Sequence, residues 1–328
     1  MNQFLRNLTP GQQVGLLFVI LFGMLMIATV TLLVVSLRER ESERGQVRAA
    51  AVGSLTGLLS TSWLIAIVFW VGWASGERVA TALFAVVSFF TLREFVTLSP
   101  TRRGDHRSLI LAFFVVLPVQ FWLVASEHFD LFSVFIPVYV FLLIPVVSAL
   151  ANDPQRFLER NAKLQWGIMV CVYGMSHVPA LLLLDFPRWD ERKNAFLVFF
   201  LVFVVQTSMV AQHLAQGWVK RPPRAPLVSS SFNWTSWGIG VAVGGLVGGL
   251  LAGITPFKPA QALAMALIAC ASGSLGHLVM KALKRDRGVP HWGGAASVTG
   301  ATGLLGRVDA LCFAAPVFFH SVRWYFDL

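Results

Sequence analysis

The sequence predicts an all-α fold, a polytopic transmembrane helical bundle with about ten spans. Three observations support this prediction: 56% of the 328 residues are hydrophobic, only 13% are charged, and the mean hydropathy is +0.70. A soluble domain carries roughly 25% charged residues, because its surface faces water. A chain with so few charges buries its side chains only if lipid covers most of them. We therefore expect an integral membrane protein without a sizeable soluble domain.

The apolar runs give the individual spans, since about 20 apolar residues cross a bilayer as a helix. The predicted spans are residues 14–37, 53–74, 79–98, 109–125, 131–150, 164–184, 195–213, 237–254, 260–280 and 310–326. The last run is short and contains His320 and Arg323. We therefore expect this last segment to reach only the membrane interface.

The basic residues predict the orientation of the chain and argue against a nucleic-acid partner. The net charge is +10, and Lys and Arg gather in alternate loops between the predicted spans. These residues include Arg38, Arg40, Arg44 and Arg48, then Arg102, Arg103 and Arg107, then Lys220, Arg221 and Arg224, and finally Lys281, Lys284, Arg285 and Arg287. The positive-inside rule places such loops in the cytoplasm, with both termini outside. We expect the inner (cytoplasmic) membrane of a bacterium.

Glycine spacing in the eighth predicted span indicates close helix packing. Gly240, Gly244 and Gly248 recur every four residues, and a second such series starts at Gly245. Small residues at this spacing let two helix backbones approach closely in lipid. The spacing fits packing within one chain or a homodimer seam equally well.

Several polar residues within apolar runs invite a metal site, but their spacing does not favour one. His213, His277 and His291 have no close, fixed spacing, and Cys171, Cys270 and Cys312 are unpaired in sequence. His177 and Pro179 are expected to form a polar contact between spans and a helix kink.

Basic residues near the C-terminus suggest phosphate chemistry. Lys284, Arg285 and Arg287 can pair with phosphate oxygens. The alternative interpretation is that they only anchor a helix end at an anionic leaflet.

The C-terminal stretch MKALKRDRGVPHWGG…GLLGRVDALCFAAPVFFH resembles the closing motif of phosphatidate cytidylyltransferases (CDP-diacylglycerol synthases). Lys284 and Arg285 match its basic pair, and Gly303, Arg307 and Asp309 match its end. The stretches LREFVTLSPTRRGDHRSL, FIPVYVFLLIP, FLERNAKLQWGIMVCVYGMSHVPALL and TPFKPAQA also resemble that family. The resemblance predicts N-terminal transmembrane helices over residues 1–80 and a cytidylyltransferase-like membrane domain over residues 81–328.

The resemblance implies magnesium-dependent transfer of CMP from CTP to phosphatidate, with release of pyrophosphate, in phospholipid biosynthesis. It implies Mg²⁺ as cofactor, and CTP and phosphatidate-like membrane lipids as partners. Asp309 would be the catalytic and metal-binding acid. Lys284, Arg285, Arg307 and Ser229 would bind substrate phosphate.

This chain departs from the family where the family carries acids. An Asp near the end of the seventh span is replaced by Met209, a Lys-Asp pair by Pro290 and His291, and the Asp before Arg307 by Gly306. In the stretch that begins at Ser229, the family's Pro, Lys-Thr and Glu-Gly are replaced by Ser230, Phe232, Asn233, Thr235 and Ser236. Magnesium requires hard oxygen ligands, which a thioether, an imidazole and a glycine do not supply.

Two functional hypotheses follow. The protein is either an active phosphatidate cytidylyltransferase or a catalytically silent relative that binds lipid or regulates an active homologue. A transporter is disfavoured, because no inverted repeat or matching pair of broken helices is evident in the sequence.

Overall fold

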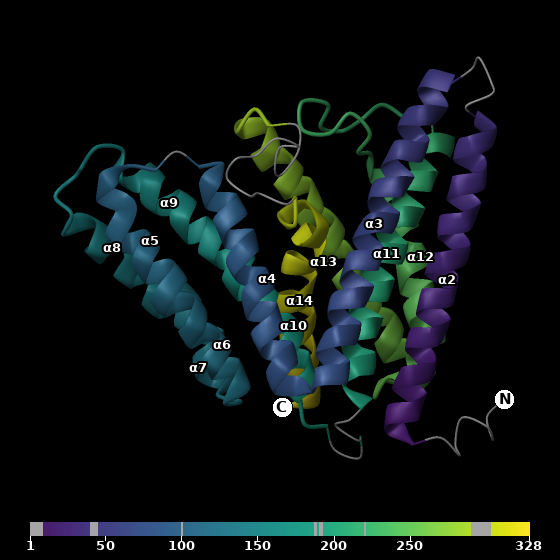
Figure 1. Cartoon of the computed structure of the whole chain (residues 1–328), viewed down its shortest axis with the longest axis horizontal. Helices are drawn as coiled ribbons and strands as arrows, with labels where there is room; N and C mark the ends of the chain where they lie inside the picture. The colour runs from purple at the N-terminus through teal and green to yellow at the C-terminus, as the bar shows by residue number, and fades with distance from the viewer. Residues whose placement is uncertain are drawn as a thin grey trace. The chain divides into compact units, whose positions relative to one another are not determined.

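The computed structural model describes residues 9–39, 45–99, 101–186, 189, 193–219, 221–289 and 303–328. Within these ranges the regular structure is helical, and strands are absent (Figure 1). Nine of the described helical segments are long and apolar enough to cross a membrane, and Ser62–Ser75 is a shorter apolar segment within a tenth long helix. The predicted all-α transmembrane bundle is therefore confirmed.

The chain forms two compact units, Met1–Gly76 and Glu77–Leu328. The first unit contains α2 (Pro10–Glu39) and α3 (Gly45–Ser75). Aromatic side chains join these two helices: the rings of Phe18 and Phe69 lie 5.1 Å apart, and Trp63 Nε1 donates a hydrogen bond of 3.0 Å to Thr29 Oγ1. The first unit is thus a helix hairpin with its own apolar seam.

The second unit holds the remaining helices, several of which join end to end into single spans. Its elements are α4 (Glu77–Thr97), η1 (Arg103–Asp105), α5 (His106–Leu111), η2 (Ala112–Val116), α6 (Leu117–Ala125), α7 (Phe129–Val134), η3 (Phe135–Val140), α8 (Phe141–Ala149), α9 (Phe157–Ile168), η4 (Met169–Gly174), α10 (Met175–Ala180), η5 (Leu181–Leu183), α11 (Ala195–Trp218), α12 (Trp234–Leu250), η7 (Leu251–Ile254), α13 (Pro259–Asp286) and α14 (Leu305–Phe326).

The last helix corrects one expectation. It begins at Leu305, five residues before the predicted start, and its 22 residues are long and apolar enough for a span. The expectation that this segment reaches only the interface is therefore wrong. The predicted span, residues 310–326, left out the first turn of α14. A side chain of α4 accepts a hydrogen bond from this turn.

The glycines of α12 pack against helices of the same chain. A Cβ added to Gly240 would lie 2.7 Å from Ser208 O on α11, and one added to Gly245 would lie 2.5 Å from Leu267 Cδ2 on α13. A Cβ on Gly248 would overlap Ala266 Cβ, also on α13. Figure 1 shows the three helices side by side. Gly240, Gly244, Gly245 and Gly248 thus serve close packing within one chain, whereas Gly253 of the second series has no neighbour within 4 Å.

Histidine 177 makes the polar contact between spans that the sequence predicts. Its side chain is fully buried in α10, and its Nε2 lies 3.2 Å from His320 Nε2 on α14. His177 Nδ1 bonds Tyr173 O at 2.7 Å, and Tyr173 Oη lies 3.0 Å from His320 Nε2. These three contacts form a polar bridge between α14 and the span that contains η4 and α10.

Candidate functional site

Asp309 is buried at the start of α14 and bonded to α13. Its side chain is 4% exposed, and Oδ2 lies 2.8 Å from His277 Nδ1. We assign the proton of this bond to Nδ1, because an ionised carboxylate only accepts hydrogen bonds. Asp309 Oδ1 accepts the Ala310 backbone N–H at 2.7 Å. Both carboxylate oxygens therefore already have a protein donor.

Glu94 is a second buried acid at this end of the bundle, and the sequence analysis did not single it out. It lies near the end of α4, is 2% exposed, and accepts the Leu305 N–H at 2.9 Å through Oε2. The first N–H groups of a helix have no partner within the helix, so Glu94 supplies a cap for α14 from another span. Its Oε1 has no hydrogen-bond partner among the described residues. An acid within an apolar run, here Glu94 next to Arg93, was the signal that could have identified it.

The predicted basic residues gather beside these acids. Lys284 and Arg285 lie in the last turn of α13, and Arg307 in the first turn of α14. Lys284 and Arg307 are half-buried and Arg285 is exposed. Lys281, one turn before Lys284, is also half-buried. A cation near a helix C-terminus is stabilised by the helix dipole, which favours the two α13 residues where they stand.

These cations lack acidic partners in the described part of the chain. No ion pair joins Lys284, Arg285 or Arg307 to a carboxylate there, whereas Arg287 pairs with Asp286 at 2.9 Å. The end of α13 and the start of α14 therefore carry cations without a close ion pair, with Glu94 acting electrostatically on Arg307 and Asp309 on Lys281. An anionic ligand is the chemical complement of such a surface.

Ser229, the fifth predicted site residue, lies on the loop between α11 and α12. It is 5% exposed and lies in the loop before α12, where its backbone N–H donates to Ala225 O at 2.8 Å. Asn233 then caps α12, its Oδ1 accepting the Ser236 N–H at 2.8 Å. No hydrogen bond joins the Ser229 side chain to Lys284, Arg285, Arg307 or Asp309 in the described ranges. The bond between His277 and Asp309 joins α13, which carries Lys284 and Arg285, to α14, which carries Arg307.

The residues present offer fewer oxygen ligands for a magnesium ion than the family motif does. The described chain contains no group of three or more His, Cys, Asp or Glu side chains placed to hold a metal. Met209 is half-buried on α11, Gly306 lies in α14, and Pro290 and His291 lie outside the described residues. Residues 290–302 contain no Asp or Glu in their sequence. Magnesium prefers several oxygen ligands in octahedral geometry, and Asp309 and Glu94 are the buried acids described at this end of the second unit.

Comparisons with known proteins agree with the motif resemblance. The profile of the cytidylyltransferase family matches residues 55–325. The uncharacterized protein YnbB of Escherichia coli (strain K12) is 33% identical over 279 residues, which are 83% of this chain and 88% of YnbB. The matched range includes Glu94, His277 and Asp309.

Proposed function

Because the chain belongs to the cytidylyltransferase family, we propose that it binds the phosphate of a phosphatidate-like lipid at the α13–α14 end. We propose further that it does so as a catalytically silent relative, without transfer of CMP from CTP. The observation that carries this proposal is the contrast between cations and acids at the site. Lys284, Arg285 and Arg307 form no ion pair within 4 Å in the described ranges, and the acids described beside them are Glu94, which acts electrostatically on Arg307, and Asp309.

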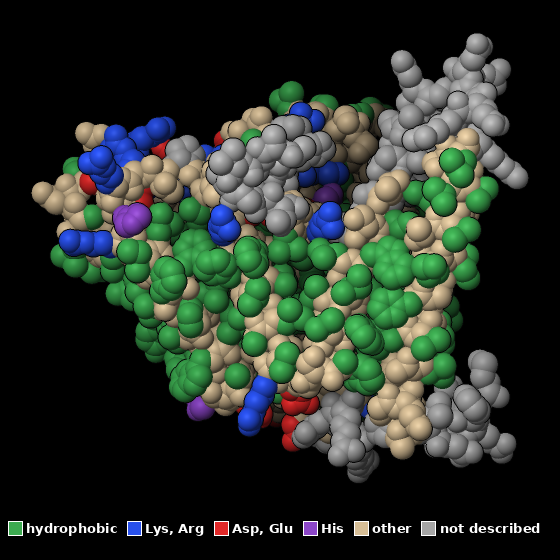
Figure 2. Space-filling model, in the orientation of Figure 1, with side chains coloured by type: hydrophobic (Ala, Val, Ile, Leu, Met, Phe, Trp, Pro, Cys, Tyr) green, Lys and Arg blue, Asp and Glu red, His purple; other side chains and the backbone are tan. Residues whose placement is uncertain are grey.

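A lipid phosphate is the anion best suited to this position. The site lies where helices end, next to a hydrophobic belt, so that a bilayer lipid reaches it without leaving the membrane. In Figure 2, Lys and Arg side chains gather near the end of the bundle where α4 ends and α13 reaches its last turn, above a hydrophobic band. The family's substrate class, a phosphatidate, carries a phosphate monoester that two or three cations can hold.

The experiment compares binding with turnover in one preparation. The full chain in lipid nanodiscs is given phosphatidate, labelled CTP and millimolar magnesium. We expect phosphatidate binding without CMP transfer above a protein-free blank. Sustained transfer that depends on magnesium would overturn the silent assignment and would establish the second candidate, the active phosphatidate cytidylyltransferase that family membership favours.

A pair of double variants tests the location of the site. Lys284→Gln with Arg285→Gln should weaken phosphatidate binding by about tenfold or more, since each hydrogen bond to a charged group contributes roughly 1.5–3 kcal/mol. Arg78→Gln with Lys258→Gln removes the same charge at the opposite ends of α4 and α13 and should leave binding unchanged. Equal losses in both double variants would place the binding elsewhere.

The silent assignment also predicts a protein partner. A relative that keeps the scaffold and lacks the acids can stabilise or regulate an active homologue, or pair with a second copy of itself. Co-purification with an active cytidylyltransferase from the same membrane in mild detergent would support the first; a clean negative result would leave lipid binding as the function.

A further inference from the structure

Three polar side chains from two spans meet near the C-terminal end of α14. His177 Nε2 lies 3.2 Å from His320 Nε2, and Tyr173 Oη lies 3.0 Å from the same His320 nitrogen. We call these three residues the His–Tyr cluster. His320 follows Asp309 by eleven positions, which is about 16 Å along a helix. The His–Tyr cluster is therefore separate from the α13–α14 site.

The hydrogen bond at His177 Nδ1 determines which ring nitrogen of this residue carries a lone pair. Nδ1 donates to the Tyr173 backbone O at 2.7 Å, because a carbonyl oxygen only accepts. In the neutral ring, Nε2 then has the lone pair, and this is the atom that lies within 3.2 Å of His320 Nε2. A histidine that binds a metal ion through one nitrogen usually donates its other N–H to a backbone carbonyl or a carboxylate. His177 already has this arrangement.

The positions of the three polar atoms suit a shared metal ion. Two nitrogen ligands at about 2.0–2.1 Å from a tetrahedral zinc ion lie roughly 3.3 Å apart. The two Nε2 atoms, at 3.2 Å, are close to this separation, and the Tyr173 phenol oxygen supplies a third ligand. The rings of Phe132 and Phe319, with centroids 4.6 and 5.1 Å from that of His177, hold the imidazole in place.

The surroundings of the His–Tyr cluster allow a cation to enter. His177 is fully buried, whereas Tyr173 and His320 are half-buried and so leave a route from outside the bundle. Arg323, one turn after His320, has its charge offset, because its Nη2 lies 3.2 Å from Asp130 Oδ1. Tyr173 also lies in the π-helical segment η4, and such segments occur frequently at functional sites.

We propose that the His–Tyr cluster binds a divalent transition-metal ion such as Zn²⁺ through His177 Nε2, His320 Nε2 and Tyr173 Oη. Imidazole suits transition metals, whereas magnesium prefers oxygen ligands. On binding, His320 takes the tautomer with its proton on Nδ1, and Tyr173 releases its phenol proton to solvent. The third ligand is a phenol, so the cluster is not one of the groups of three His, Cys, Asp or Glu that the described chain lacks. This site does not depend on the function proposed for α13 and α14.

The test titrates the full chain in detergent with Co²⁺ as a spectroscopic probe, after a chelator has removed bound metal and without a histidine tag. We expect saturable binding with the visible absorption of tetrahedral Co²⁺, and displacement by Zn²⁺. His320→Gln should weaken Co²⁺ binding by about 100-fold or more, since even outer-shell partners of a metal ligand contribute roughly 10- to 100-fold. His128→Gln, which changes an exposed histidine beside α7, is the matched control and should bind normally. Absence of saturable binding, or equal loss in both variants, would overturn the proposal.

A second pair of variants separates a metal site from a bridge made only of hydrogen bonds. Tyr173→Phe should weaken Co²⁺ binding and change the visible spectrum, whereas Tyr139→Phe, at an exposed tyrosine of η3, should do neither. This pair also provides the test if His320→Gln does not fold. Zn²⁺ should raise the unfolding temperature of the unmodified protein, because the ion binds the folded state. If Zn²⁺ leaves that temperature unchanged, the cluster is a hydrogen-bonded bridge and the proposal is wrong. The Lys284→Gln, Arg285→Gln double variant should bind Co²⁺ normally, which separates this site from the first.

Discussion

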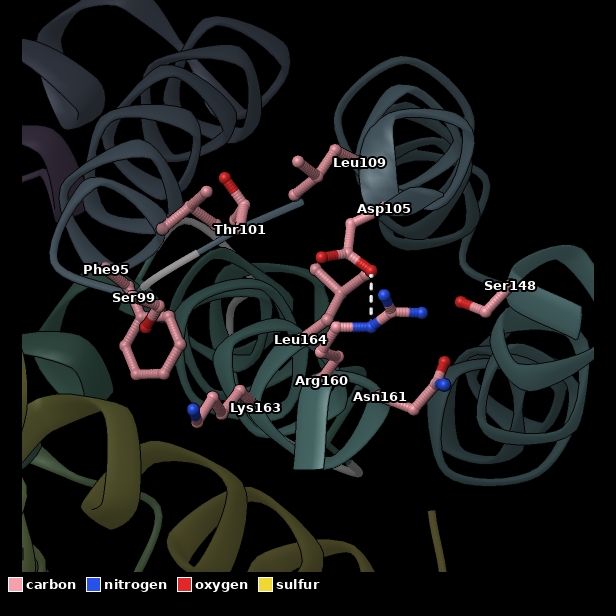
Figure 3. A pocket seen from close by; sticks show the side chains of 11 residues that line it. Phe95, Ser99, Thr101, Asp105, Leu109, Ser148, Arg160, Asn161, Lys163 and Leu164 are labelled. Carbon is pink, nitrogen blue, oxygen red and sulfur yellow. Dashed lines mark ion pairs between the residues drawn. The ribbon is translucent and has the colours of Figure 1, made fainter. Parts of the chain in front are cut away.

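Two clusters of charged residues at the same end of the second unit differ in how their charges are paired. Around the start of α9, Arg160 Nε lies 3.1 Å from Asp105 Oδ1, and its Nη1 bonds Asp153. At the start of α14, Asp309 is bonded to the His277 imidazole and to a backbone N–H, while Lys284 and Arg285 remain without acidic partners in the described ranges. In the first cluster, which we call the closed cluster, Arg160 is paired with two carboxylates of the same chain (Figure 3 shows the pair with Asp105). In the second cluster, Lys284 and Arg285 form no ion pair in the described ranges and can pair with a ligand.

The difference shows which buried charges belong to the fold and which to a site. A buried ion is retained at low cost only when it is paired and hydrogen-bonded. Arg160 meets this requirement from within the chain, so that the charge is structural. The cations of α13 and α14 meet it only with a ligand or with water, which is the arrangement of a binding surface.

The largest expected effect is on the closed cluster. Arg160→Met leaves Asp105 buried without its cation, and breaking a buried pair in this way costs about 3–5 kcal/mol. Thermal unfolding in detergent should show the loss. Arg156→Met, on an exposed residue of the same helix, should cost less than about 1 kcal/mol. Similar stability of the two variants would contradict the structural role of Arg160.

A smaller effect is expected at the cap of α14. Glu94→Leu removes the acceptor of the Leu305 N–H, and loss of a cap costs about 0.5–2 kcal/mol. Glu94→Gln keeps an acceptor oxygen and should restore most of this stability. The comparison of the two variants by unfolding in detergent separates the hydrogen bond from the charge. A Gln variant as unstable as the Leu variant would mean that the charge, rather than the cap, holds α14.

The effect on stability should be smaller still for Asp309→Asn. The carboxamide oxygen still accepts the His277 hydrogen bond, so the stability loss should stay below about 1 kcal/mol, the usual difference between one neutral and one charge-assisted bond. Phosphatidate binding should be kept or strengthened, because the negative charge that acts on Lys281 disappears. Loss of phosphatidate binding would instead indicate that Asp309 holds a metal or the ligand itself.

The smallest expected effect is on stability at low pH. The Arg160 guanidinium donates a hydrogen bond to Asp153 and holds the pKa of that carboxyl below its usual range. A depressed folded-state pKa contributes stability that is complete above the unfolded pKa, near 3.9, and is lost as the pH falls through the lower folded value. Asp153→Asn should therefore flatten the decline of the unfolding temperature below about pH 4. If the unfolding temperature of the variant falls as steeply as that of the unmodified protein, Asp153 does not contribute to the stability of the closed cluster.

Much of the fold could be predicted from the sequence, and much of the site could not. Apolar runs report how each segment partitions into lipid, a property of the segment alone, so the helices and the family motif at Arg307 and Asp309 were accessible. The bond between Glu94 and the Leu305 N–H joins residues 211 positions apart. No local pattern encodes such a partner, and the early start of α14 was missed for the same reason.

The sequence by itself determined that this protein is an all-helical membrane protein of the cytidylyltransferase family, because composition and motif are properties of the chain. Only the tertiary structure decided that α12 glycines pack on α11 and α13, that His277 is hydrogen-bonded to Asp309, and that Glu94 accepts the Leu305 N–H. Each of these depends on which helix faces which, and neighbouring helices in lipid are selected by shape and hydrogen bonding rather than by hydropathy.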